Sequence, residues 1–282
     1  MEMYNKYQFI GCESDYLKAT KVIFGAPFDG TSSFRPGSRF APSKVRIDSY
    51  ALETYSPYLD LDLEEINIHD AGDLEFPFGN TKRVLDIIND FVSNVYNSNK
   101  KPLMIGGEHL VSLPAISAAY KKHNDLVVLH FDAHTDLRED YLGEKYSHAT
   151  VMKRAWDLLG DDRIYQFGIR SGLREEFEWS SKGHTFINKF SFNLLDDVIK
   201  KTNDKPVYIT IDLDILDPSI FSGTGTPEPG GISFNNMMTI IKKLSSLNIV
   251  GADIVELSPD YDTSGVSTAV ACKIIREMLL IL

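Results

Sequence analysis

The sequence contains only two cysteines, Cys12 and Cys272, which lie far apart and outside any metal-binding spacing. Such sparse cysteine predicts a reducing compartment. The chain also lacks an apolar run of the length that a membrane span needs. The segment MEMYNKYQFI at its start lacks the apolar region of a signal peptide. We therefore expect a cytoplasmic protein.

Positive charge is scarce, because 29 lysines and arginines stand against 40 aspartates and glutamates, a net charge of −11. Nucleic-acid phosphates and anionic lipid headgroups would not attract such a protein, so neither is expected as a partner. The acidic excess mildly favours a small cationic substrate. Hydrophobic residues make up 43% of the 282 positions, which is ordinary for a soluble enzyme with a sizeable core.

No repeat, low-complexity segment or linker divides the sequence, so residues 1–282 are expected to form a single domain. Short β-branched apolar runs alternate with amphipathic stretches. The predicted strands are Lys21–Gly25, Ile66–His69, Pro102–Ile105, Leu126–Phe131, Arg163–Gly168, Pro206–Ile211 and Ile249–Glu256. The predicted helices are Thr81–Ser98, Leu113–Lys122, His148–Leu159, Ser191–Lys201, Ser233–Ser246 and Ser267–Leu282.

The predicted strands are apolar throughout, which is typical of strands that are buried on both faces of a parallel sheet. Alternation of strands and helices then predicts a three-layer α/β/α sandwich with a mostly parallel central sheet. In open parallel sheets, ligands bind beyond the carboxyl ends of the strands. The residues that directly follow each strand are therefore the first candidates for a functional site.

Histidine and carboxylate side chains follow four of the predicted strands. They are His109 in GGEH, Asp132, His134 and Asp136 in FDAHTD, Asp212 and Asp214 in TIDLDILDP, and Glu256 in VELSP. Side chains two residues apart in extended chain project to one side, so the members of each motif can converge on one point. A lone D-x-H more often caps a helix or a turn, but this combination at several strand ends predicts a site.

Two nearby features are given structural interpretations. His130 lies inside a strand beside the cluster and is interpreted as a packed core residue. The stretch DAGD, residues 70–73, is interpreted as a turn.

So many carboxylates in one crevice would repel one another strongly unless cations balanced them. Four aspartates and two histidines are too many ligands for one tetrahedral zinc ion, but they suit two metal ions that share bridging carboxylates. Oxygen-rich ligation without thiolate favours Mn²⁺, although Co²⁺, Ni²⁺ or Fe²⁺ would accept the same ligands. Two such ions commonly hold a bridging water and lower its pKa, which supplies hydroxide near neutral pH.

These motifs resemble those of the ureohydrolase family, which contains the arginases, the agmatinases and their relatives. The resemblance covers nearly the whole chain. It runs through GTSSFRPGSRFAPSKVR, GGEH, FDAHTD, SHAT, ITIDLDILDPSIFSGTGTPEPGG and VELSP. It implies an arginase-like α/β/α fold, two Mn²⁺ ions per subunit and assembly as a homotrimer or homohexamer.

The resemblance also implies roles for individual residues. The implied metal ligands are His109, Asp132, His134, Asp136, Asp212 and Asp214. Glu256 is expected to pair with a substrate guanidinium, because a planar cation with a fork of N–H donors suits a carboxylate. His148, in YSHAT, is the expected proton shuttle, and Thr226, in GTGTP, is expected in the substrate pocket.

The implied reaction is hydrolysis of a guanidino group to urea and an amine. A metal-bridging hydroxide attacks the guanidinium carbon, and Asp136 accepts a hydrogen bond that orients it. The leaving amine needs a proton, which a histidine such as His148 can deliver.

The choice of guanidino compound stays open between two candidates. Agmatine, cleaved to putrescine and urea in polyamine biosynthesis, is favoured because LREDYLGEKYSHAT resembles bacterial agmatinases more than arginases. Arg138 stands where arginases have a substrate-binding asparagine. An arginine beside the substrate suits a carboxylate, which keeps guanidinobutyrate or another guanidino acid as the alternative.

Arginase and formimidoylglutamase activities are further possibilities within the family. Two other classes also remain: a single-zinc deacetylase of the same general fold, and a metal-binding homologue without catalysis. The full ligand set and Glu256 argue against both. The loop Arg35–Arg39 is expected to line either the pocket mouth or a subunit contact.

Overall fold

The computed structural model describes residues 7–282. Residues 1–6 lie outside this range. They make up most of the N-terminal segment in which the sequence analysis expects no signal peptide. Among the described residues, no helix combines the length and the apolar character that crossing a bilayer would require.

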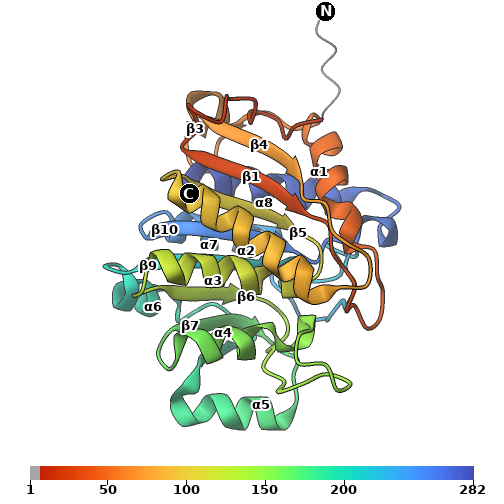
Figure 1. Cartoon of the computed structure of the whole chain (residues 1–282), viewed down its shortest axis with the longest axis vertical. Helices are drawn as coiled ribbons and strands as arrows, with labels where there is room; N and C mark the ends of the chain where they lie inside the picture. The colour runs from red at the N-terminus through yellow and green to blue at the C-terminus, as the bar shows by residue number, and fades with distance from the viewer. Residues whose placement is uncertain (1–6) are drawn as a thin grey trace, which may run out of the picture.

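An eight-stranded sheet runs through the molecule in the order β4-β1-β5-β10-β9-β6-β7-β8, and all of its neighbouring strands are parallel (Figure 1). The strands are β1 (Lys21–Ala26), β4 (Ile68–Asp73), β5 (Lys101–Gly106), β6 (Val127–Phe131), β7 (Ile164–Ile169), β8 (Phe186–Lys189), β9 (Pro206–Asp212) and β10 (Asn248–Val255). Two short strands, β2 (Tyr55–Ser56) and β3 (Leu61–Asp62), form a separate antiparallel pair.

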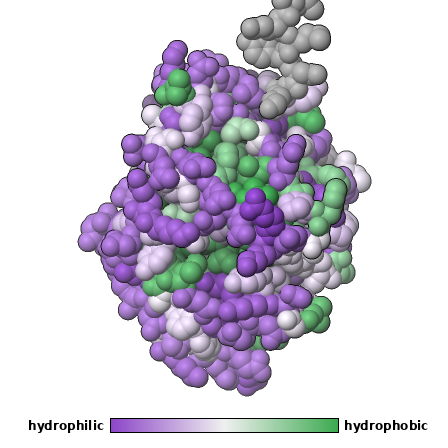
Figure 2. Space-filling view, viewed as in Figure 1, coloured by the Kyte–Doolittle hydropathy of each residue, from purple (hydrophilic) through white to green (hydrophobic). Residues whose placement is uncertain are grey.

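Helices cover both faces of this sheet. They are α1 (Ala41–Ser49), α2 (Thr81–Asn97), α3 (Ser112–Lys122), α4 (Val151–Leu159), α5 (Arg174–Trp179), α6 (Leu195–Thr202), α7 (Phe234–Leu244) and α8 (Val266–Ile281). Helices α2, α3 and α4 lie on the face that is in front in Figure 1, and α1, α6, α7 and α8 pack on the opposite face. The front surface is mostly hydrophilic, with hydrophobic side chains visible near its centre (Figure 2).

Alternation along the strands divides the core between the two faces. In β6, Val127, Leu129 and Phe131 pack with the α1, α6, α7 and α8 side, whereas Val128 points to the α2, α3 and α4 side. Every residue of β6 is buried, as expected for a strand in the middle of a parallel sheet. The predicted three-layer fold and its mainly parallel sheet are therefore confirmed.

The structure differs from the sequence prediction at β4, where residues 70–73 continue a strand and the turn interpretation is wrong. Asp70 makes this polar strand possible because its carboxylate is paired with the buried guanidinium of Arg46 in α1, at 2.7 Å. Arg46 also pairs with Asp73. Arg46, which lies on another element, therefore balances part of the negative charge of this strand.

The four strands that precede the predicted site, β5, β10, β9 and β6, are direct neighbours in the sheet. Because they are parallel, their carboxyl ends lie at the same edge. The sheet order therefore brings motifs that are up to 147 positions apart to one place.

Candidate metal centre

The turns that follow β6 and β9 are built by the aspartates themselves. The side chain of Asp132 accepts a hydrogen bond from the backbone N–H of His134 at 2.5 Å. The side chain of Asp212 accepts one from the N–H of Asp214 at 2.8 Å. Aspartate favours such local turns because its short side chain reaches the backbone two residues on. The D-x-H and D-x-D spacing thus sets the local chain direction. It also sets the direction of the second carboxylate oxygen of Asp132 and of Asp212.

Two residues at this edge have left-handed backbone conformations that non-glycine residues rarely adopt. Asp136 has a φ of 52° and Glu256 a φ of 64°. Such conformations cost on the order of 1–3 kcal/mol and persist where the surrounding structure demands them. Both residues are predicted site residues, so this backbone strain lies at the candidate metal and substrate site.

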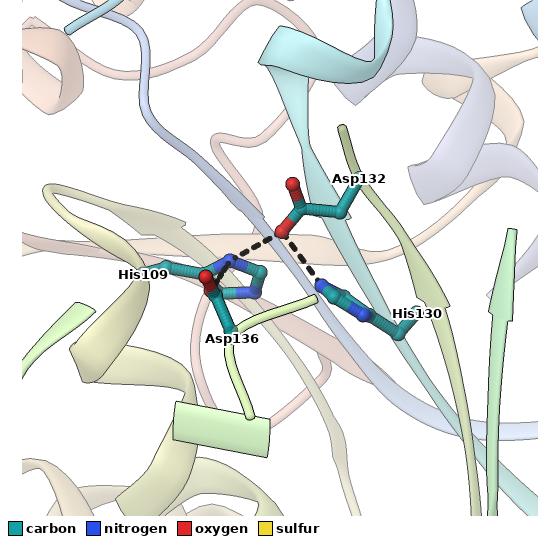
Figure 3. Close-up of side chains that lie close together, drawn as sticks. All are labelled: His109, His130, Asp132 and Asp136. Carbon is teal, nitrogen blue, oxygen red and sulfur yellow. Dashed lines mark hydrogen bonds and ion pairs between the residues drawn. The ribbon is translucent and has the colours of Figure 1, made fainter. Parts of the chain in front are cut away.

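The six predicted ligands form two groups that share Asp132. In the first group, Nδ1 of His109 lies 3.0 Å from Oδ2 of Asp132 and 3.2 Å from Oδ2 of Asp136. The same nitrogen lies 3.3 Å from Oδ2 of Asp212. Figure 3 shows the carboxylates of Asp132 and Asp136 both close to the ring of His109.

In the second group, Nδ1 of His134 lies 2.9 Å from Oδ2 of Asp214 and 3.5 Å from Oδ1 of Asp132. Asp132 therefore presents one oxygen to each histidine. A carboxylate that is shared in this way is the arrangement expected of a bridging ligand between two metal ions.

The chemistry of the donors fits cations. Nδ1 of His109 is buried and makes no hydrogen bond of good geometry within the described structure, although three carboxylates surround it. Its other nitrogen, Nε2, lies 2.9 Å from Oγ1 of Thr210, which in turn donates to Asp253 at 2.6 Å. With the Nε2 proton directed at Thr210, the Nδ1 lone pair faces negatively charged oxygens, and a cation between them resolves that conflict.

Burial raises the pKa of Asp212 well above its usual range, and the neighbouring Asp214 and Asp132 carboxylates raise it further. The pKa of Asp214 is also raised, again chiefly by burial. Without cations, these carboxylates therefore tend towards their protonated forms. The residues present thus fit two divalent ions, with five of the six ligands buried and His134 partly exposed.

Four of the predicted ligands, His109, His134, Asp136 and Asp212, line a cavity of about 260 Å³. Glu256, Thr226, His148 and Arg138, which the sequence placed in the substrate site, all line this cavity. Oε1 of Glu256 accepts a hydrogen bond from the backbone N–H of His109 at 2.8 Å. Burial, followed by the nearby Glu108, raises the pKa of Glu256 well above its usual range. A cationic substrate would supply the missing counter-charge.

The remaining pocket residues occupy the walls. The hydroxyl of Thr226 lies 3.3 Å from Oδ2 of Asp214. The ring of His148 lies against Ser33, with Nε2 3.2 Å from the Ser33 hydroxyl, and burial lowers the pKa of His148. The guanidinium of Arg138 stacks over the ring of Tyr141, 4.6 Å from its centroid.

The structure also shows contacts at the site that the sequence analysis did not predict. His130 is fully buried, as predicted, but Nε2 of its ring is 2.7 Å from Oδ2 of Asp132, so it also supports the cluster (Figure 3). Glu176 lines the cavity, and its buried carboxylate accepts a hydrogen bond from the N–H of Leu137 at 3.0 Å. Only the position of His130, two residues before Asp132 in an extended strand, signalled its contact.

The loop Arg35–Arg39 reaches the site. Arg35 lines a small cavity next to Glu256 and His148, and its guanidinium lies 5.2 Å from the ring centroid of Tyr261. Arg35 therefore lies beside residues that line the main cavity.

Comparison with known proteins agrees with this geometry. Residues 19–281 match the model of the Arginase family. The chain is 48% identical to the agmatinase of Bacillus subtilis, over 99% of this chain and 97% of that protein. It is 35% identical to the guanidinobutyrase of Pseudomonas aeruginosa, over 96% of this chain and 88% of that protein. The crystal structure of agmatine ureohydrolase of Thermoplasma volcanium superposes with a TM-score of 0.90 at 38% identity, covering 99% of this chain and 95% of that one.

The fold and the site thus define a metal-dependent hydrolase of the ureohydrolase class. The chain belongs to the arginase family, as its motifs predicted.

Proposed function

We propose that this protein is an agmatinase, which hydrolyses agmatine to putrescine and urea. The observation that carries the proposal is the position of Glu256, whose buried carboxylate is tied to the backbone of a predicted metal ligand and lines the same cavity. The similarity to the Bacillus subtilis agmatinase over nearly the full length of both chains supports this substrate.

His109, Asp132, Asp136 and Asp212 would hold one metal ion, and His134, Asp132 and Asp214 would hold the other, both as Mn²⁺. When bound, the two ions supply Lewis acidity and lower the pKa of a water molecule towards neutrality. Carboxylate and imidazole donors without thiolate are compatible with Mn²⁺.

The protein's own residues bind and orient the substrate. Glu256 would accept hydrogen bonds from the guanidinium, which fixes its plane in the cavity. Asp136 would accept a hydrogen bond from the attacking water, so that a lone pair of that water faces the guanidinium carbon. Thr226, on the adjacent wall, would contact the same planar group.

His148 would deliver a proton to the leaving amine. An amine is a poor leaving group until it is protonated, and an imidazole with a pKa near neutrality suits both uptake and release of a proton. Burial lowers the pKa of His148, which favours the neutral ring and makes the protonated ring a stronger acid towards the leaving amine.

A guanidino acid such as 4-guanidinobutyrate is the second candidate substrate. The observation that favours it is the guanidinium of Arg138, which lines the cavity and would attract a carboxylate. In the agmatinase proposal, Arg138 instead stays stacked on Tyr141 and away from the distal ammonium of agmatine.

We further propose that the enzyme acts in the cytoplasm as a homotrimer or homohexamer, and that its product enters polyamine biosynthesis. The experiment that tests the substrate is release of urea by Mn²⁺-loaded protein from agmatine, arginine and 4-guanidinobutyrate, measured side by side. Preference for agmatine is the expected result. Preference for the acid would overturn the agmatinase proposal and make Arg138 the specificity residue.

A further inference from the structure

We propose that Glu108 and Thr31 position the imidazole of His148 and fix its neutral tautomer, with the hydrogen on Nδ1 and the lone pair of Nε2 facing the cavity. The inference deepens the proposed function, because it rests on His148 as the proton carrier. Glu108 and Thr31 would be positioning residues that act through His148.

Glu108 is fully buried between the strand end of β5 and the loop that follows β1. One carboxylate oxygen lies 2.5 Å from the hydroxyl of Thr31. The other accepts hydrogen bonds from the backbone N–H of Thr31 at 2.9 Å and from the hydroxyl of Ser32 at 3.1 Å. Three donors from one short segment thus converge on a single side chain.

The backbone locks the same two loops together. The N–H of Glu108 donates to the carbonyl oxygen of Phe28 at 2.8 Å. A Cβ atom at Gly107 would lie 1.9 Å from that oxygen, so only glycine permits this approach. Glu108 therefore has a fixed position relative to the segment that carries Thr31.

Thr31 links Glu108 to His148 through hydrogen bonds. Its hydroxyl has one hydrogen, which is directed to the Glu108 carboxylate, so the oxygen faces His148 as an acceptor. It accepts the backbone N–H of His148 at 3.1 Å, and Nδ1 of the ring lies 3.5 Å away. The second distance is long, but hydrogen bonds at such sites commonly shorten once substrate is bound.

The tautomer of His148 follows from the direction of the hydrogen bonds that Thr31 makes. Since the Thr31 oxygen has its own hydrogen committed to Glu108, it pairs only with a protonated Nδ1. Nε2 then carries the lone pair and lies 3.2 Å from the hydroxyl of Ser33, which also lines the cavity. Tyr141 approaches the ring with a centroid distance of 5.6 Å and an interplanar angle of 80°, which limits its rotation on another side.

The test compares Thr31→Val, which removes the hydroxyl at nearly constant volume, with Thr31→Ser, which retains it.

For Thr31→Val we expect kcat for urea release from agmatine to fall by about 10- to 100-fold, with KM and bound Mn²⁺ unchanged. Thr31→Ser is expected to keep kcat within about threefold of the unmodified protein. An unchanged kcat in Thr31→Val, or an equal loss in Thr31→Ser, would overturn the proposal.

A second measurement does not depend on turnover. The ¹⁵N chemical shifts of the His148 ring, assigned by their absence in His148→Asn, report the tautomer in metal-free protein. We expect the Nδ1–H form in the unmodified protein and in Thr31→Ser, and its loss in Thr31→Val. The Nε2–H form in the unmodified protein would refute the inference. Absence of urea release from every substrate, with the Nδ1–H form present, would instead refute the proposed function alone.

Discussion

The backbone N–H of His109 donates a hydrogen bond to Oε1 of Glu256 at 2.8 Å. His109 follows β5 and Glu256 follows β10, and these strands are adjacent in the sheet. The bond fixes the proposed guanidinium-binding carboxylate relative to the proposed metal ligands. Its second consequence is that the oxygen not bound to His109 is free to face the cavity.

Replacing Glu256 by glutamine is expected to weaken substrate recognition strongly while leaving the metal centre intact. Glutamine still accepts the hydrogen bond from His109 but lacks the charge that pairs with a guanidinium. A buried charged partner contributes roughly 3–4 kcal/mol, so kcat/KM for agmatine should fall about 10²- to 10³-fold. Steady-state kinetics together with metal analysis check this, and activity within tenfold of the original would speak against a role in substrate binding.

Asp132→Asn is expected to remove bound metal from both positions, because Asp132 is shared by the two ligand groups. Metal analysis after dialysis should find fewer than about one ion per chain. The matched control is Asp125→Asn, on an exposed aspartate that pairs with Arg163 and should leave metal content unchanged. Retention of two ions by Asp132→Asn would refute its assignment as a shared ligand.

Arg170 supports the turn that carries Asp214. Its guanidinium donates to the carbonyl oxygens of Asp214 at 2.6 Å, Ile215 at 3.2 Å and Glu228 at 2.8 Å. Lysine cannot reach these acceptors together, so Arg170→Lys should lower the free energy of unfolding by about 1–3 kcal/mol.

Urea denaturation checks this prediction, with Arg163→Lys as the control because Arg163 pairs with an exposed aspartate. A denaturation midpoint equal to that of the unmodified protein would show that the turn does not depend on Arg170.

Asp262 makes the free energy of unfolding depend on pH in the acidic range. Its carboxylate accepts hydrogen bonds from Ser264 and Ser267 just before and within α8, which lower the pKa of Asp262 to about 2. Because the pKa is lower in the folded state, this stabilisation is complete above the unfolded pKa of about 4 and is lost as the pH falls through about 2.

The variant Asp262→Asn has no such titration. The difference in unfolding free energy between it and the unmodified protein should be constant above about pH 5 and should shrink as the pH falls below 4. Denaturant titrations at several pH values measure it. A difference that grows on acidification would contradict the assignment.

Arg138→Ala separates the two substrate candidates. If agmatine is the substrate, the stacked Arg138 is a bystander, and kcat/KM for agmatine should change less than about threefold. If Arg138 binds a carboxylate, activity towards 4-guanidinobutyrate should fall while activity towards agmatine rises. Parallel kinetics with both substrates distinguish these outcomes.

The sequence predicted the strand-end motifs because two physical rules act locally. Extended chain places alternate side chains on one side, and apolar strands in a parallel sheet end at a common edge. These rules were enough to predict that Asp132, His134 and Asp136 lie near His109, as the structure shows. Their roles as ligands stay a prediction until metal is measured.

Other features could not be predicted because their partners are distant in the chain. Glu108 meets Thr31 across 77 positions, and no local pattern signals that contact. Helix α1 was missed because its buried set includes Arg46 and Ser49, which do not read as an apolar face. The same Arg46 explains why residues 70–73 form a strand despite two aspartates.

The most direct test of the account is titration of metal-free protein with Mn²⁺ while urea release from agmatine is measured. The account predicts no activity without metal and full activity at two equivalents per chain, because Asp132 is shared by two ligand groups. Full activity at one equivalent, or activity that does not depend on metal, would contradict it.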